Sequence, residues 1–141
     1  MAKLWAAGGG DVHRLVEDYC FAGDVVLDAA LVRYDILGSL AHAEMLRKIG
    51  VLSAAELSAL QTGLRRVLGS YERGRWRIEA SDEDVHTAVE TRLSKVGLKL
   101  HTARSRNDQV LTDMRLYSKD HLIRVAADLA GLAEVWVKLA R

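Results

Sequence analysis

The sequence predicts an all-α protein, and three observations support this fold class. The 141 residues contain no proline, and aromatic residues make up only 6% of them. Alanine, leucine, arginine and glutamate, which favour helices, are plentiful. Apolar residues recur at helical spacing through most of the chain. We expect a small N-terminal helical lobe over residues 1–100, followed over residues 101–141 by a loop and the first long helix of a central helical bundle, which is truncated.

The first half of the chain carries signals for three helices. Asp11 can cap a short first helix, and helical spacing of apolar residues then runs over about residues 25–49. Gly50 is a suitable residue to end that second helix. Residues 53–56, Ser-Ala-Ala-Glu, form a capping-box pattern that opens a third helix. Within the second helix, the small residues Gly38–Ser39 favour a close crossing with another helix.

A connector over residues 69–78 follows the third helix. Its Trp76 and Ile78 are expected to pin it to the core. Ser81 is then a capping signal for a helix that reaches about Ser94. The three acids at positions 82–84 would fall in its first turn, where the helix dipole stabilises negative charge.

The last segment, from about Asp108 to Arg141, predicts one long helix of roughly 50 Å. Its apolar surface is too wide and too long for the preceding short helices to cover, so other long helices should pack beside it. No helix stop signal precedes the last residue, so we interpret the chain as cut inside a helix. The apolar positions form two neighbouring stripes: Val110, Met114, Tyr117 and His121 in one, and Leu111, Leu122, Val125, Leu129, Leu132 and Trp136 in the other.

Composition limits the classes of protein to consider. There is no long uncharged apolar run, so we expect a soluble protein without a membrane span. The N-terminus lacks the apolar core of a secretory signal. The single cysteine, Cys20, cannot form an internal disulfide and fits a reducing cytoplasm. A net charge of +1 with interspersed signs argues against nucleic-acid binding as the main function.

The segment of residues 100–110, Leu-His-Thr-Ala-Arg-Ser-Arg-Asn-Asp-Gln-Val, is the best candidate for a binding site. Arg104 and Arg106 can each offer a planar fork to a carboxylate or phosphate. The first backbone N–H groups of the long helix also favour an anion there. Ser105 and Asn107 are good N-cap residues. By residue types alone, a solvated loop that caps a helix explains this segment equally well.

The string His101–Val110 resembles the first signature region of the argininosuccinate lyases, in the fumarase/aspartase superfamily. Three other stretches agree with the family: Leu4–Trp5, Tyr34–Ala43 and Asp82–Glu90. Their order and spacing also fit. The resemblance covers nearly the whole chain, but only the N-terminal third of such an enzyme.

The resemblance implies a reaction, a set of residues and an assembly. These enzymes cleave argininosuccinate to arginine and fumarate by a reversible β-elimination without a cofactor, through an aci-carboxylate. Residues matching Arg106 and Asn107 contact the substrate, while Ser105 and Gln109 are neighbours that shape the loop. Family members are homotetramers whose active sites combine signature regions from different subunits. The resemblance thus implies a cytoplasmic enzyme of arginine biosynthesis.

Three features depart from the family pattern. Ala103 stands where many members have glycine, and we expect its methyl group to change little. Asp24 stands where some members have a substrate-contacting serine, and a carboxylate cannot donate as a hydroxyl does. The Thr-His of the second signature and the serine-bearing loop of the third belong further downstream, with the proposed catalytic base. We therefore expect no catalytic base in this chain and no activity from it alone.

The histidines give no metal signal, because none of the five has metal-ligand spacing with another histidine or with Cys20. Two interpretations of His86 stay open. It either orients or faces a ligand near the 100–110 segment, or it bonds to its own acidic turn. For His42, a packed core residue is the favoured interpretation.

Two other functions remain possible for the chain. It could be a short, non-catalytic product that acts as an oligomerisation module for itself or for a complete lyase. It could instead belong to a related fumarate-releasing lyase with a different succinyl substrate, although the string at residues 105–108 argues against this.

Overall fold

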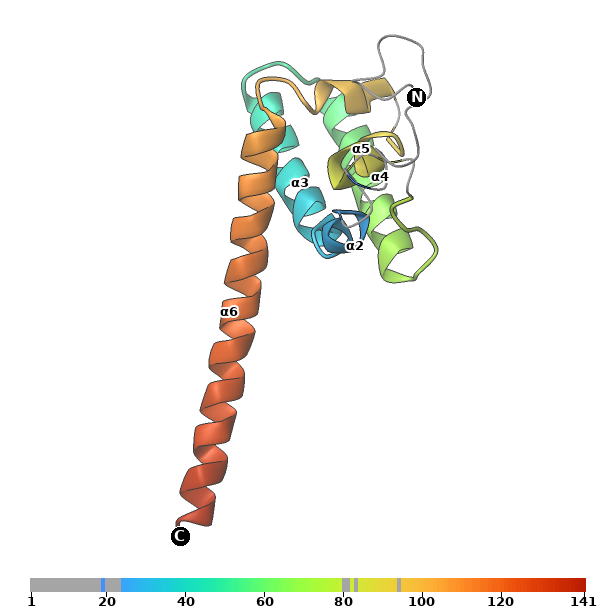
Figure 1. Ribbon diagram of the computed structural model, residues 1–141. Coiled ribbons are helices and arrows are strands. Elements are labelled where there is room, and N and C mark those ends of the chain that lie inside the picture. The colour runs from blue at the N-terminus through green and yellow to red at the C-terminus, as the bar shows by residue number, and fades with distance from the viewer. Residues whose placement is uncertain (1–18, 20–23, 80–81, 83, 94) are drawn as a thin grey trace.

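The computed structural model describes residues 19, 24–79, 82, 84–93 and 95–141 (Figure 1). Within this part of the chain every regular element is helical, which confirms the all-α prediction. The short helix expected after Asp11 lies outside the described residues. The elements are α2 (Asp24–Ala29), α3 (Val32–Lys48), α4 (Ala54–Glu72), α5 (Val85–Glu90), a 3-10 helix η1 (Lys95–Lys99) and α6 (Arg106–Leu139).

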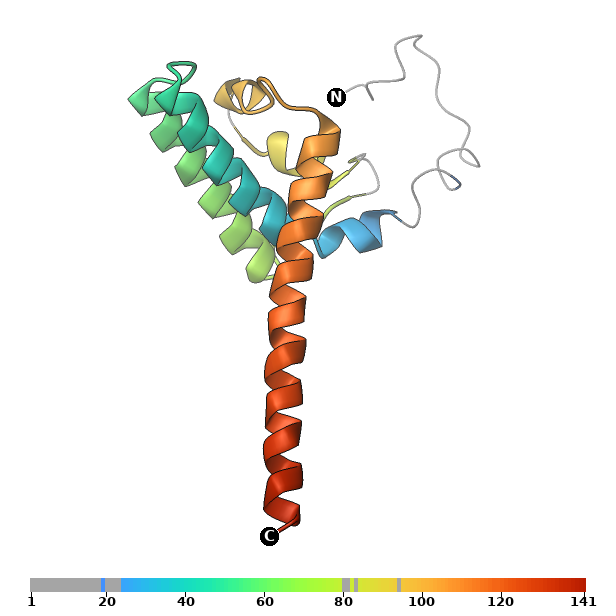
Figure 2. The same ribbon diagram turned by 90° about the vertical axis from the view of Figure 1, so that its left-hand side faces the viewer.

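Helices α3 and α4 form a hairpin that carries most of the core (Figure 2). The turn between them uses two predicted signals. Gly50 follows the end of α3 with a φ of 81°, a conformation that favours glycine. Ser53 Oγ accepts from the Glu56 backbone N–H at 3.2 Å, and the Glu56 carboxylate accepts from the Ser53 N–H at 2.8 Å. The predicted capping box is therefore confirmed.

The core lies between α3, α4, α5 and the segments that flank them. Trp76 and Ile78 of the connector pack against it, as expected. Not every apolar residue of the segment predicted to be helical over about residues 25–49 faces the core, because Leu37 and Ile49 are exposed. The buried residues that form this core cluster are Val32, Ile36, Ala43, Leu46, Leu52, Leu60, Leu64, Val67, Ile78, Val85, Ala88, Val89 and Leu100.

Two predicted helices have different bounds in the structure. The helix expected over about residues 25–49 is two helices, because tight i→i+3 bonds from Ala30 N to Leu27 O and from Leu31 N to Asp28 O end α2. The helix expected from Ser81 to Ser94 is the short α5. Its N-cap is Asp84, whose Oδ1 accepts from the Thr87 N–H at 2.7 Å. The described acids at 82 and 84 thus precede the helix and do not form its first turn.

Helix α6 crosses α3 with its N-terminal part and then extends far beyond the lobe (Figures 1 and 2). The crossing is close at Gly38, where a Cβ would lie 3.5 Å from Thr112 Cγ2 and 3.6 Å from Asp113 Oδ1. This confirms the expectation for Gly38–Ser39. Helix α6 begins at Arg106, two residues earlier than expected, because Ser105 is its N-cap.

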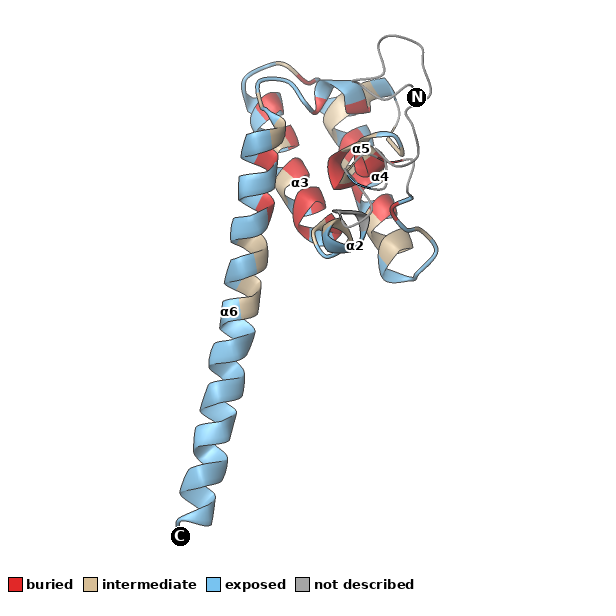
Figure 3. Cartoon of the chain, viewed as in Figure 1, coloured by how far each residue is buried: buried red, intermediate tan, exposed pale blue. Residues whose placement is uncertain are grey.

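The face of α6 that packs on the lobe is polar. Gln109 and Asp113 are its buried residues. The residues of both predicted apolar stripes are largely exposed, and from Leu122 onward every residue of α6 is exposed (Figure 3). As predicted, the other described helices leave this surface uncovered. A helix of 34 residues is about 50 Å long. None of the described helices has a stretch apolar and long enough to span a membrane.

Candidate functional site

The candidate site lies where α3, α5 and the start of α6 meet. Helix α5 begins there with Asp84 as its N-cap, and the next backbone N–H, of Val85, donates to Asp28 Oδ2 at 2.9 Å. The N-terminal turn of α5 is thereby tied to α2 as well as to its own cap. This places two side chains of α5, His86 and Thr87, at the junction.

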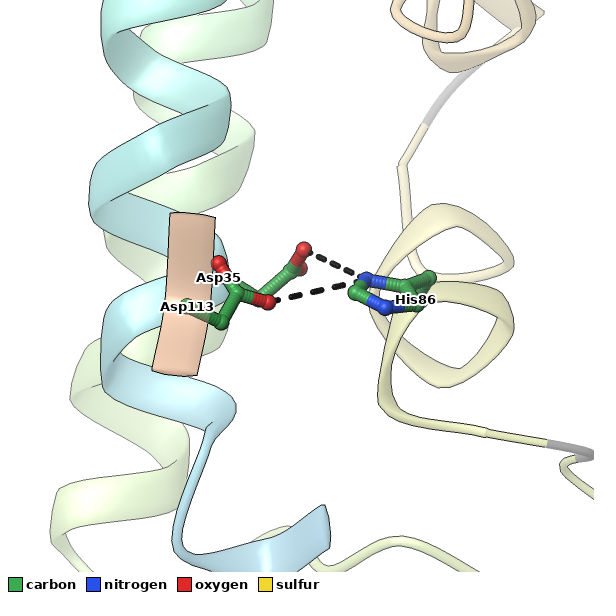
Figure 4. A group of neighbouring side chains, drawn as sticks. All are labelled: Asp35, His86 and Asp113. Carbon is green, nitrogen blue, oxygen red and sulfur yellow. Dashed lines mark hydrogen bonds and ion pairs between the residues drawn. The ribbon is translucent and has the colours of Figure 1, made fainter. Parts of the chain in front are cut away.

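His86 belongs to a buried cluster with two aspartates from other helices (Figure 4). Its Nδ1 lies 2.8 Å from Asp35 Oδ1 of α3 and 3.9 Å from Asp113 Oδ2 of α6. All three side chains are at most 3% exposed. The interpretation that His86 bonds to its own acidic turn is therefore wrong, because its partner is Asp35, 51 positions earlier. An orienting role for His86 stays a prediction.

The charges in this cluster perturb one another. Burial alone lowers the pKa of His86, but the hydrogen bond and charge of Asp35, with the charges of Asp84 and Asp113, outweigh it and raise the pKa above 6.5. Burial and the neighbouring Asp35 raise the pKa of Asp113 to about 7. Burial also lowers the pKa of the nearby Arg104 guanidinium, against the attraction of Asp35, Glu90 and Asp113. Within this cluster, Asp113 therefore has a pKa near neutral pH.

Asp35 and Asp113 were not predicted from the sequence as members of a site. Asp35 lies among the buried residues of α3, and Asp113 lies on the face of α6 that packs on the lobe. A charged residue is rarely buried unless it is paired. That pattern is a signal that could have selected them. Their meeting with His86 depends on how three helices pack, which residue spacing does not report.

Arg106, predicted to bind substrate, is the first residue of α6 and reaches back to α5. Its Nη2 donates to Thr87 Oγ1 at 2.8 Å, and its Nε lies 3.5 Å from Asp84 Oδ2. The Nη1 atom is buried and has no hydrogen-bond partner. The guanidinium is therefore held through Nη2 and Nε, while its Nη1 remains a donor without a partner.

The other predicted site residues have different surroundings. Asn107 is exposed at the start of α6. Gln109 is buried, with Nε2 3.4 Å from His86 Nδ1 and with Oε1 unpartnered.

Ser105 Oγ accepts from the backbone N–H groups of Asn107 at 2.9 Å and Asp108 at 3.4 Å. These two N–H groups, expected to be available to an anion, are therefore already used. Asp24 begins α2, and its side chain lies outside the described part of the structure.

The loop before α6 is held against α3. Arg104 Nη2 donates to Ser39 Oγ at 3.0 Å, and His42 Nε2 lies 3.0 Å from the Thr102 carbonyl oxygen. Burial lowers the pKa of His42, although its bond to Thr102 acts in the opposite direction. Contrary to the expectation of a packed core residue, His42 is half-buried and anchors this loop.

Ala103 has a φ of 61°, the only positive φ at a described non-glycine residue. This left-handed conformation costs an L-residue roughly 1–2 kcal/mol but costs glycine almost nothing. The expectation that the methyl group of Ala103 changes little is therefore wrong. The alanine strains the loop that leads into Arg104 and Arg106.

Asp35, His86 and Asp113 also have the atom types that can ligate a metal, with the ligand atoms within 4.8 Å of one another. Residue spacing gave no sign of this group, because its members come from three helices. The hydrogen bond between His86 and Asp35 already uses two of these ligand atoms, and the charge of Arg104 acts on both aspartates. A divalent cation would have to displace that bond and lie close to the guanidinium.

Comparisons with known proteins show which family the chain resembles. A family profile described as a lyase matches residues 20–141. The argininosuccinate lyase of Streptococcus suis (strain 05ZYH33) is 43% identical over 145 residues, which cover 99% of this chain and 31% of that protein. The argininosuccinate lyases of Desulforamulus reducens and Desulforudis audaxviator are 42% and 43% identical, again over 31% of their lengths.

Because the profile matches most of the chain, the chain belongs to this lyase family. Within it, the chain is similar to the N-terminal part of argininosuccinate lyases, which confirms the resemblance seen in residues 101–110. The chain spans about a third of the length of these curated relatives.

Proposed function

We propose that this chain is the N-terminal part of an argininosuccinate lyase and supplies substrate-binding groups for the cleavage of argininosuccinate to arginine and fumarate. The observation that carries the proposal is Arg106, which is held by Thr87 and Asp84 and has one buried, unpartnered N–H group. The signature string around it and the relatives' printed names support the choice of reaction.

The chemistry explains why such a group is useful. Removal of a proton next to a carboxylate gives an aci-carboxylate with two negative charges on one group. Fixed donors and positive charge stabilise this intermediate most where water is excluded. Arg106 offers a planar cationic fork and the exposed Asn107 offers a neutral donor. Because Ser105 uses the backbone N–H groups of Asn107 and Asp108, the proposal assigns the contacts with the substrate to the side chains of Arg106 and Asn107.

The rest of the proposal follows from the same family. The base and the remaining substrate contacts come from segments beyond those represented here, no cofactor takes part, and the complete enzyme is a cytoplasmic homotetramer. Neither nucleic acid nor a membrane is a partner. The boundary near residue 100 between a lobe and a bundle domain stays part of this proposal.

A chimera tests the function directly. Residues 1–141 would replace the matching N-terminal part of the Streptococcus suis enzyme, and fumarate release from argininosuccinate would be measured by its ultraviolet absorbance. We expect activity in the chimera and a loss of roughly 100-fold or more in kcat/KM on Arg106→Ala or Asn107→Ala. Lys119→Ala, at an exposed position of α6, is the matched control.

Three outcomes would argue against the proposal. An assembled but inactive chimera would contradict it, and so would cleavage of adenylosuccinate in preference to argininosuccinate. Fumarate release by the 141-residue chain alone, above its Arg106→Ala variant, would contradict the absence of a base from these residues.

The second candidate function is a non-catalytic oligomerisation module, which the exposed apolar surface of α6 favours. It predicts that the 141-residue chain enters mixed oligomers with a complete lyase. Co-purification of a tagged chain with the untagged Streptococcus suis enzyme would measure this.

A further inference from the structure

The position of the Arg106 guanidinium depends on the first turn of α5. Thr87 Oγ1 accepts from Arg106 Nη2, and Asp84 Oδ2 lies close to Arg106 Nε. Asp84 also caps the same turn through the Thr87 N–H. Any shift or rotation of residues 84–87 therefore moves both groups that hold the arginine.

Helix α5 cannot fix this turn by itself. It has six residues, and a helix of this length does not persist in water without tertiary contacts. Its buried apolar side chains are Val85, Ala88 and Val89. These contacts decide which face of α5 turns inward, but they set the position of the first turn less precisely than a hydrogen bond does.

The bond from the Val85 N–H to Asp28 Oδ2 ties the backbone of this turn to α2, and His86 supplies a directional side-chain contact to α3. His86 lies between the two residues that hold Arg106, and its ring points to Asp35 and Asp113 (Figure 4). The bond to Asp35 Oδ1 is fully buried, and both groups are ionisable. A charge-assisted hydrogen bond of this kind is short and geometrically specific. It connects α5 to α3, against which α6 packs.

We propose that His86 is a positioning residue for Arg106: its bond to Asp35 fixes the first turn of α5, and this turn holds the Arg106 guanidinium in its binding position. His86 does not touch the substrate in this role. The structural part of the inference concerns this chain alone, whereas its effect on catalysis rests on the proposed lyase function.

The structural part can be tested by labelling arginines in the 141-residue chain. Phenylglyoxal modifies exposed, unrestrained guanidinium groups, and peptide mass spectrometry would give the rate at each arginine. We expect His86→Asn to raise the rate at Arg106 several-fold and to leave Arg33, on the outer face of α3, unchanged. The matched control is Tyr34→Phe, which removes the α3–α6 hydrogen bond to Asp120 and leaves α5 untouched.

A second variant guards against loss of the fold. If His86→Asn speeds labelling at Arg33 as well, the lobe has opened, and Asp35→Asn would be measured instead, because it keeps an acceptor of the same shape. A selective rise at Arg106 in a folded variant supports the proposal. An unchanged Arg106 rate in a folded variant overturns it.

The catalytic part can be tested by a double-mutant cycle in the chimera. If His86 acts through Arg106, His86→Asn lowers kcat/KM roughly tenfold or more in the parent but changes it little in an Arg106→Ala background. A residue with only a structural role would cause the same fold-loss in both backgrounds, which would overturn the inference. An inactive parent chimera would count against the proposed function, and the labelling result would still decide the structural part.

Discussion

Asp113 Oδ2 lies 3.9 Å from His86 Nδ1, in a cluster where neither side chain is more than 3% exposed. Asp113 Oδ2 accepts no hydrogen bond, so the carboxylate faces the imidazole with one oxygen unsatisfied. Burial and the charge of Asp35 raise the pKa of Asp113 to about 7, and the carboxyl therefore takes up a proton near neutral pH. This relationship links the stability of the lobe to pH.

We expect the free energy of unfolding to fall as pH rises from about 5 to about 8. Both groups contribute with the same sign. The pKa of Asp113 is raised from 3.8 to about 7, so the folded state keeps a proton that the unfolded state has released. The pKa of His86 is raised above 6.5, so its stabilising charge is complete below pH 6.5 and is lost as pH rises through its folded-state pKa.

The measurement is urea unfolding followed by far-UV circular dichroism at several pH values. Asp113→Asn should flatten the decline by about 2 kcal/mol, because an amide cannot ionise. The charged groups facing Asp113 are Asp28 of α2, Asp35 of α3, His86 of α5 and Arg104 of the loop. The same pH slope in Asp113→Asn and in the parent would show that Asp113 does not titrate in this range.

Replacing Ala103 by glycine should stabilise the chain. Its φ of 61° strains an alanine, and the strain relieved is about 1 kcal/mol, less the greater entropy that glycine gives the unfolded chain. Thermal unfolding would measure the gain. The matched control is Ala126→Gly, an exposed position inside α6 that should cost up to about 1 kcal/mol. A destabilised Ala103→Gly variant would mean that the residue does not adopt the left-handed conformation in solution.

The crossing of α3 and α6 at Gly38 admits a methyl group but nothing larger. A Cβ there would make ordinary contacts at 3.5 and 3.6 Å with Thr112 and Asp113. We expect Gly38→Ala to be neutral or stabilising, because alanine is the better helix former. Gly38→Leu should cost about 1–3 kcal/mol by overpacking. Equal stabilities of the two variants in urea unfolding would show that the helices can move apart without cost.

The exposed apolar surface of α6 should drive self-association. Leu129 is 60% exposed and Trp136 is 68% exposed, so burying them in a helical bundle is favourable. We expect the 141-residue chain to associate with rising concentration, and Leu129→Glu with Trp136→Glu to reduce this. Sedimentation equilibrium would measure it, with Lys119→Glu as control. A monomer at every concentration would contradict the expectation.

The sequence by itself determined much of the local structure. The capping box at Ser53, the N-cap at Ser105 and the turn at Gly50 depend on residues close together in the chain, so their patterns are readable in the sequence. The long helical spacing likewise predicted α6. The signature string singled out Arg106 and Asn107, but the helix was expected from about Asp108, and the structure begins α6 at Arg106. Prediction was poorer where local signals compete, as in the break between α2 and α3 and the late start of α5.

Only the tertiary structure decided how the site is held. The pairing of His86 with Asp35 spans 51 positions and that of Arg106 with Thr87 spans 19, and neither leaves a periodic trace in the sequence. The same is true of the polar face that α6 turns to the lobe through Gln109 and Asp113. Apolar patterns report which surfaces must leave water, because the hydrophobic effect is non-directional. Buried ionic contacts require specific distances, which exist only once the helices have packed.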